Sequence, residues 1–63
     1  MMNQLPQDPF MLLSAVNMML RDGDFESLED LCAYYDADLP QLCGQLRAAG
    51  YVYDEAQRRF RPL

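Results

Sequence analysis

A chain of 63 residues is long enough for one small domain at most. It contains no His, Lys, Trp, Thr or Ile. Without His there is no imidazole base, no Ser–His or Cys–His pair and no ordinary zinc site, and without Lys there is no Schiff-base chemistry. We therefore expect a protein that is not an enzyme and that uses no cofactor or metal.

The charge is acidic and uneven along the chain. Ten acids face five Arg, for a net charge of -5, and the first fifty residues hold eight of the acids but only two of the Arg. Such a chain is repelled by phosphate backbones and by anionic membranes, so nucleic acid is a disfavoured partner. With no leader and no apolar run of about 18 residues, we expect a cytoplasmic protein that does not enter a membrane.

The first predicted element is a helix over about 8–21, after a loose N-terminal lead over 1–7. Asp8 is a typical N-cap and Pro9 suits the first helical position. On a helical wheel only Ser14, Asn17 and Arg21 are polar. The apolar arc covers about 220°, roughly twice that of an ordinary surface helix. Such a helix is either central to the fold or buries a second face in a partner.

Two shorter helices are predicted over about 27–36 and 38–49. Ser27 and Asp38 are their expected N-caps, with Gln41 at the capping-box position of the second. Each helix carries an apolar stripe with a Leu-x-x-Leu-Cys edge, and Gly50 is the expected C′ residue of the second helix. Since the turn between them is very short, the pair resembles a helix-turn-helix.

The pattern changes to that of a hairpin over about 51–61. Tyr51 and Tyr53 are expected on one face, residues 54–57 form the turn, and Phe60 is the anchor. The predicted fold is mainly α: one domain over 8–63, with three short helices in a helix-turn-helix-like bundle and a small C-terminal β-hairpin. The expected core is Leu12, Leu13, Val16, Met19, Leu20, Leu28, Leu31, Tyr35, Leu42, Leu46, Tyr53 and Phe60.

The wide apolar arc of the first helix suggests a protein-interaction surface. Met11 and Met18 lie at the edge of the arc and close together on the wheel, with Ala15 between them. Methionine is common on surfaces that bind protein partners, although it also fills gaps in cores. We expect a non-catalytic interaction module that binds a protein partner or a second copy of itself through this helix; no small-molecule substrate is evident.

The alternative function is that of a winged helix-turn-helix protein that binds nucleic acid. Gln and Arg side chains on a recognition helix can read base edges, and Arg side chains on a wing can contact phosphate. The candidate contacts are Gln41, Gln45, Arg47, Arg58, Arg59 and Arg61. The structural interpretation is that the last three Arg keep an edge strand from pairing with another chain and aggregating.

Two further sets of side chains have structural interpretations that we prefer. We expect Asn17 to hold a loop backbone, and Arg21 to interact with the end of its helix and to pair with Glu26 or Asp30. Cys32 and Cys43, without His or a C-x-x-C spacing, are expected to be small buried hydrophobes; the alternative is a catalytic thiol.

Several strings of residues resemble a family of short bacterial proteins of unknown function. They are Leu-Pro-Gln-Asp-Pro from Leu5, Met-Leu-Leu-Ser from Met11, Val16-Asn17, Leu20-Arg21-Asp22, Ser27-Leu28, Leu31-Cys32 and the closing Gly-Tyr-Val-Tyr from Gly50 with Phe60. The resemblance spans about residues 5–60 and implies a cytoplasmic, single-domain bacterial protein, but no chemistry. The chain departs from the family pattern at Arg58 and Arg59. The closing hairpin also resembles that of small winged helix-turn-helix domains, in architecture only.

Overall fold

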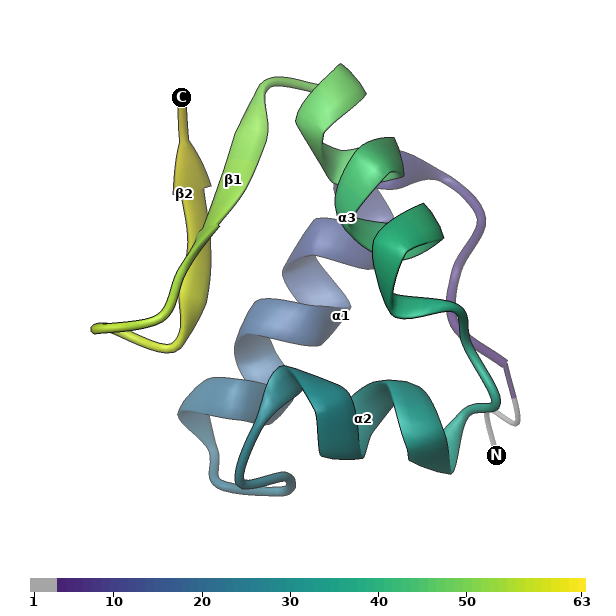
Figure 1. Cartoon of the computed structure of the whole chain (residues 1–63), viewed down its shortest axis with the longest axis vertical. Helices are drawn as coiled ribbons and strands as arrows, with labels where there is room; N and C mark the ends of the chain where they lie inside the picture. Colours follow the sequence, from purple (N-terminus) through teal and green to yellow (C-terminus); the bar gives the residue numbers. More distant parts are fainter. Residues whose placement is uncertain (1–3) are drawn as a thin grey trace.

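The computed structural model describes residues 4–63 and contains three helices followed by a two-stranded antiparallel hairpin (Figure 1). The elements are α1 (Pro9–Arg21), α2 (Leu28–Tyr34), α3 (Leu39–Ala48), β1 (Tyr51–Asp54) and β2 (Arg59–Pro62). Of the loose lead predicted over 1–7, residues 1–3 lie outside the described range. The predicted mainly α fold with a C-terminal hairpin is confirmed, and each helix end lies within two residues of its predicted position.

The helices begin at the predicted caps, although only two of the caps are made by side chains. The Asp8 carboxylate accepts from the Met11 N–H at 3.0 Å, and Ser27 Oγ accepts from the Asp30 N–H at 3.1 Å. Asp38 occupies the N-cap position of α3 but makes no side-chain capping bond. The capping box expected between Asp38 and Gln41 is therefore wrong, and α3 starts instead with Pro40 in its first turn.

A left-handed residue follows each of the three helices, and after α1 it is Gly23 with φ 80°. Gly50, the predicted C′ residue of α3, has φ 98° and donates from its N–H to the Arg47 carbonyl at 2.9 Å. Asp36 takes the same position after α2 with φ 54°, and the next N–H, that of Ala37, bonds to the Cys32 carbonyl at 2.8 Å. This reversal turns the chain sharply into α3, which rises steeply away from α2 (Figure 1).

The hairpin pairs Tyr53 with Phe60 and Asp54 with Arg59. One Asp54 carboxylate oxygen accepts from the N–H groups of Ala56 and Gln57, at 3.0 and 3.2 Å, while the Asp54 backbone remains in β1. The turn therefore covers residues 55–58, one residue later than predicted. Phe60 anchors the hairpin as predicted, with its ring 5.1 Å from that of Tyr53.

The core lies where α1, α2, α3 and the hairpin meet. α1 packs against β2 and α3, and α3 packs against β1. The buried side chains are Leu12, Val16, Leu20, Leu28, Leu31, Cys32, Leu42, Leu46 and Phe60. Four predicted core residues, Leu13, Met19, Tyr35 and Tyr53, are only half-buried and pack around this cluster. In a domain this small, bulky side chains at the margin of the core remain partly in contact with water.

Candidate protein-interaction surface

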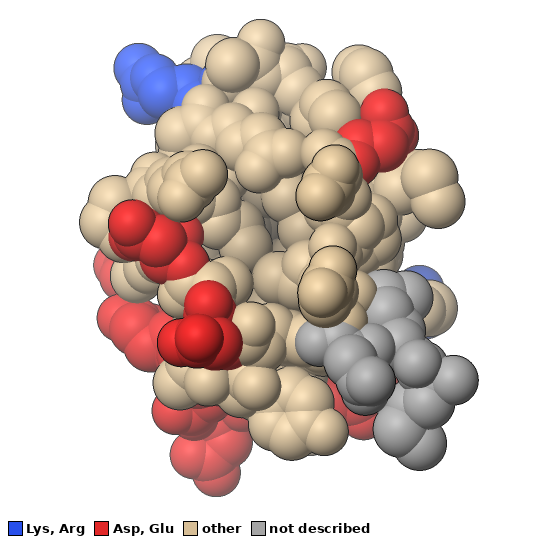
Figure 2. All heavy atoms as spheres, turned by 90° about the vertical axis from the view of Figure 1, so that its right-hand side faces the viewer, with Lys and Arg blue, Asp and Glu red and all other residues tan. Residues whose placement is uncertain are grey.

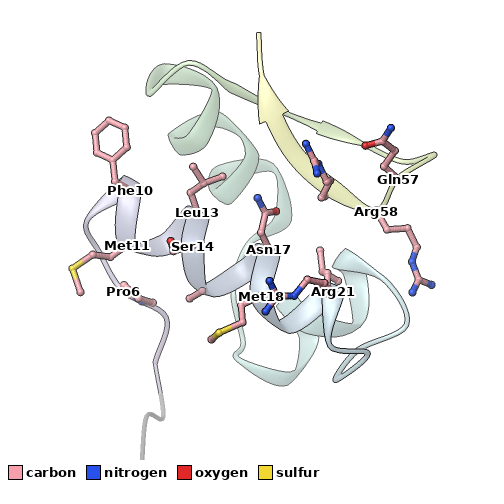
Figure 3. Close-up of a pocket in the computed structure, with 13 residues that line it drawn as sticks. Pro6, Phe10, Met11, Leu13, Ser14, Asn17, Met18, Arg21, Gln57 and Arg58 are labelled. Atoms are coloured by element: carbon pink, nitrogen blue, oxygen red, sulfur yellow. The ribbon is translucent and has the colours of Figure 1, made fainter.

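A groove of about 1100 Å³ runs along the outward face of α1 and is bounded at one end by the hairpin turn (Figure 3). We call it the α1 groove. It is lined by Pro6, Phe10, Met11, Leu13, Ser14, Ala15, Asn17, Met18, Leu20, Arg21, Gln57, Arg58 and Arg59. Most of its lining comes from the side of α1 turned away from the buried Leu12 and Val16, and the core residue Leu20 reaches its edge.

The predicted interaction residues come together in this groove. Met11 is 62% and Met18 51% exposed, and Figure 3 shows both side chains projecting from the same side of α1. Ala15, half-buried, lies between them on the helix. None of these three side chains belongs to the buried core. The part of the apolar arc of α1 that the core does not use therefore faces solvent in the monomer.

Phe10 belongs to the same surface, although sequence analysis did not single it out. It is 58% exposed, and its ring meets that of Tyr51 edge-on at 6.4 Å. The contact with Tyr51 fixes the start of α1 beside β1 but covers only part of the ring. On the helical wheel it lies between Asn17 and Arg21, about 100° from Met11, so the apolar periodicity did not place it on the arc.

Three arginines line the α1 groove, which contains no acidic residue among its lining. Arg58 has φ 56° and donates from Nη1 to the Glu26 carbonyl at 3.0 Å, so the hairpin turn is tied to the loop before α2. Arg21 Nε lies 3.3 Å from the Asp22 carboxylate. The predicted pairing of Arg21 with Glu26 or Asp30 is therefore wrong, because the adjacent C-cap residue is nearer.

Asn17 reaches from α1 to the edge of β2. Its Nδ2 donates to the Phe60 carbonyl at 3.0 Å, and its Oδ1 accepts from the Phe60 N–H at 2.8 Å. The side-chain amide thus satisfies both backbone hydrogen-bonding groups of Phe60, as a neighbouring strand would. The structural role expected for Asn17 is confirmed, with a strand in place of a loop as the segment it holds.

The candidate nucleic-acid contacts do not form one surface. Arg58 and Arg59 line the α1 groove, whereas Gln41 and Gln45 of α3 line a second groove beside Leu5. Three of the six side chains already have partners within the chain. Gln45 donates to the Gln7 carbonyl at 2.8 Å, Arg58 to Glu26 as above, and Arg61 lies 3.3 Å from Asp54. Arg47 is exposed at the end of α3.

The side of the molecule formed by α3 and the end of α2 is acidic or uncharged (Figure 2). Red acidic side chains are spread over its lower part, and blue basic side chains appear only at its margins. This is the side that a helix-turn-helix pair would present to DNA, where basic groups are needed to neutralise phosphate.

Both thiols are held in their neutral form. Burial, then the neighbouring Cys43, Glu29 and Asp38, raises the pKa of Cys32 above its usual value of 9.0, and burial and Glu29 raise the pKa of Cys43. A reactive thiol needs the opposite shift. Within residues 4–63, no group of metal-ligating side chains gathers, and no helix is long and apolar enough to cross a membrane.

The fold and the surface define a small helical domain with a C-terminal hairpin and an unpartnered apolar groove, without an evident catalytic centre in its described part. The chain belongs to the family described as domain of unknown function (DUF4250), which matches residues 6–60. No curated protein and no solved structure matched the chain.

Proposed function

We propose that this chain is a non-catalytic protein-interaction module of the cytoplasm that binds its partner through the α1 groove. The observation that carries the proposal is the exposure of Met11 and Met18 on one face of α1, with the exposed ring of Phe10 about 100° around the same helix from Met11. Single exposed hydrophobes are ordinary, but a contiguous group with a polar rim is typical of a protein-binding site. Here the rim is formed by Arg21, Arg58 and Arg59.

The composition of the groove suits a protein partner better than a small ligand. The groove is shallow and long, and flexible methionine side chains adapt to the shape of an apolar partner. Small-molecule sites are usually enclosed and carry a few convergent polar groups. Asn17, one of the two amides in the lining beside Gln57, already has both of its hydrogen-bonding groups on Phe60.

Methionine oxidation inside the cell tests this proposal. Peroxide converts accessible methionine to the sulfoxide, which mass spectrometry counts residue by residue. We expect Met11 and Met18 to oxidise several-fold more slowly in the cells that produce the protein than in the purified protein at high dilution. Met19, which packs against the core and accepts a hydrogen bond from the Tyr35 hydroxyl, is the internal control and should not change. Equal rates for Met11 and Met18 in the two settings would contradict the proposal.

The competing hypothesis, a winged helix-turn-helix that binds nucleic acid, requires the same chain to attract phosphate. Its candidate wing residues Arg58 and Arg61 would have to leave the Glu26 carbonyl and the Asp54 carboxylate, respectively. Its candidate recognition residue Gln45 would have to release Gln7. The gel-shift experiment in the Discussion separates the two hypotheses.

A further inference from the structure

The outward face of α1 has a two-fold pattern within its own sequence. Its midpoint lies between Ser14 and Ala15, two small residues. Met11 and Met18 stand equally far from this point in opposite directions, and Asp8 and Arg21 stand equally far beyond them. A copy of the helix laid antiparallel across the first would therefore place each Met11 against a Met18 and each Asp8 against an Arg21.

We propose that the partner in the α1 groove is a second copy of this chain, with the two α1 helices packed antiparallel about a two-fold axis beside Ala15. This inference rests on the proposed function and names its partner. The interface is isologous, because the same residues contribute from both copies.

The size of the side chains allows this approach. Ser14 and Ala15 at the crossing point let the helix axes come within about 8 Å of each other, the short end of the usual range. The longer Met11 and Met18 side chains then fill the space on either side, and Phe10 extends the apolar contact at the outer ends. The packing covers Met11 and Met18, two of the five large apolar side chains that are exposed within residues 4–63.

Charge selects the antiparallel orientation. Arg21 is exposed, with 75% of its side chain accessible and its Nε 3.3 Å from Asp22, and it shares its end of the groove with Arg58 and Arg59, so positive charge still prevails there; the exposed Asp8 stands at the other end. A parallel pair would bring the two arginine clusters together and align the helix dipoles unfavourably. An antiparallel pair separates the clusters, brings each toward an Asp8, and opposes the dipoles.

Charge also favours this face over others for self-association. The chain has a net charge of -5, so two copies repel each other in most orientations. The α1 groove is lined by three arginines and by no acid, so it is a face on which two copies meet without acidic groups opposing each other.

Disulfide trapping at chosen positions tests the arrangement. Ala15→Cys lies beside the axis, so two copies should link to each other under oxidised glutathione. Two copies of Met11→Cys should not link, because in the antiparallel pair these positions are about 10 Å apart along the helices, beyond the reach of a disulfide. An equimolar mixture of Met11→Cys and Met18→Cys should give the mixed dimer, and the wild type, treated alike, controls for Cys32 and Cys43.

Other patterns overturn the inference. Linkage of Met11→Cys to itself, without a mixed product, would show a parallel pair. Absence of any link beyond that of the wild type would show that two copies do not meet on this face.

Sedimentation provides an independent measurement with a matched control. We expect the wild type at high micromolar concentration to sediment with twice its monomer mass of 7.3 kDa. Ala15→Glu should return the mass to that of the monomer, while Ala33→Glu, which adds the same charge to an exposed alanine of α2, should leave the dimer intact. Circular dichroism checks that both variants fold, and a dimer that survives Ala15→Glu overturns the inference.

The two proposals fail separately. If the wild type is a monomer but Met11 and Met18 are protected from peroxide in the producing cells, then the partner is a different protein, and this inference alone is wrong. If the wild type is a monomer and both methionines are as accessible in the cell as in dilute solution, both proposals are wrong.

Discussion

Single residues tie distant parts of this small domain together. Asn17 binds the backbone N–H and carbonyl of Phe60, 43 residues away, and Arg58 binds the carbonyl of Glu26, 32 residues away. Each uses a side chain to satisfy backbone groups that no neighbouring strand covers. Since a two-stranded hairpin is marginal alone, these contacts and the burial of Phe60 hold it on the helices.

Asn17→Ala should destabilise the domain by about 2 kcal/mol, because both hydrogen-bonding groups of Phe60 lose their partner at a half-buried edge. For a domain of this length, that is a fall in melting temperature on the order of 10 °C. Thermal unfolding followed by circular dichroism measures it. Ser14→Ala on the exposed face of α1 is the control and should change the melting temperature by less than about 2 °C; equal effects would show that the Asn17 contacts contribute nothing.

The raised pKa values of Cys32 and Cys43 predict slow thiol chemistry and a loss of stability at alkaline pH. The folded protein holds these protons more tightly than the unfolded chain, so the contribution of the two thiols to stability is fully present below their unfolded pKa of 9.0 and is lost as pH rises from there through the folded pKa values. Iodoacetamide at neutral pH should modify both thiols more slowly than free cysteine, with buried Cys32 the slowest. Modification of either thiol faster than free cysteine would support the catalytic alternative; modification in urea is the control for accessibility.

At the scale of elements, local sequence signals settle where each helix starts and stops. Asp8–Pro9, Ser27 and Gly50 take the predicted positions, because capping depends on a few adjacent residues. The side-chain capping bond predicted at Asp38 does not form. A residue type that favours the N-cap position makes this hydrogen bond possible but does not require it. Asp36, in a left-handed conformation usual for glycine, was not predictable as a helix stop from its neighbours.

Gly44 and Gly50 should respond in opposite ways to the same substitution. Gly44 is exposed within α3 and a Cβ there meets nothing within 4 Å, so Gly44→Ala should stabilise the domain by about 0.5–1 kcal/mol. Gly50 has φ 98°, so Gly50→Ala should destabilise it by about 1–2 kcal/mol. Urea denaturation of the two variants beside the wild type measures both changes; a gain from Gly50→Ala would contradict the left-handed end of α3.

The sequence predicted which face of α1 is exposed and apolar, but not the contacts that bound the α1 groove at the hairpin turn. The periodicity of α1 separates Met11 and Met18 from Leu12 and Val16, so the exposed methionines could be foreseen from spacing alone. The pairing of Arg21 and the binding of Arg58 to Glu26 depend on where the hairpin settles against α1. Such contacts between distant segments leave no periodic pattern in the sequence. The contact of Phe10 with Tyr51 is one of them, so Phe10 was not predicted.

At the scale of the whole molecule, charge is unevenly distributed, and it opposes nucleic-acid binding. The arginines lie at the end of α1, the end of α3 and the hairpin, while acids flank and occupy α2. The helix-turn-helix-like pair thus lacks the basic surface that its architecture would need to bind DNA.

We therefore expect no shift of mixed-sequence DNA in a gel at about 50 mM salt with micromolar protein, since non-specific binding at low salt depends on electrostatic attraction to phosphate. A basic DNA-binding domain of similar size is the positive control. A shift that weakens steeply with salt and is lost on Arg47→Ala or Arg59→Ala would favour the winged helix-turn-helix over the interaction module.

The bond between Asn17 and Phe60 also has a consequence for synthesis on the ribosome. α1 is made early, yet the strand that Asn17 holds and the phenyl ring that completes the core emerge 43 residues later. Until then the core side chains of α1, Leu12, Val16 and Leu20, are not fully buried. The nascent chain therefore exposes apolar side chains on both faces of its first helix. The domain can therefore complete its folding only after β2 has left the ribosome, and until that moment part of its core surface is exposed to water.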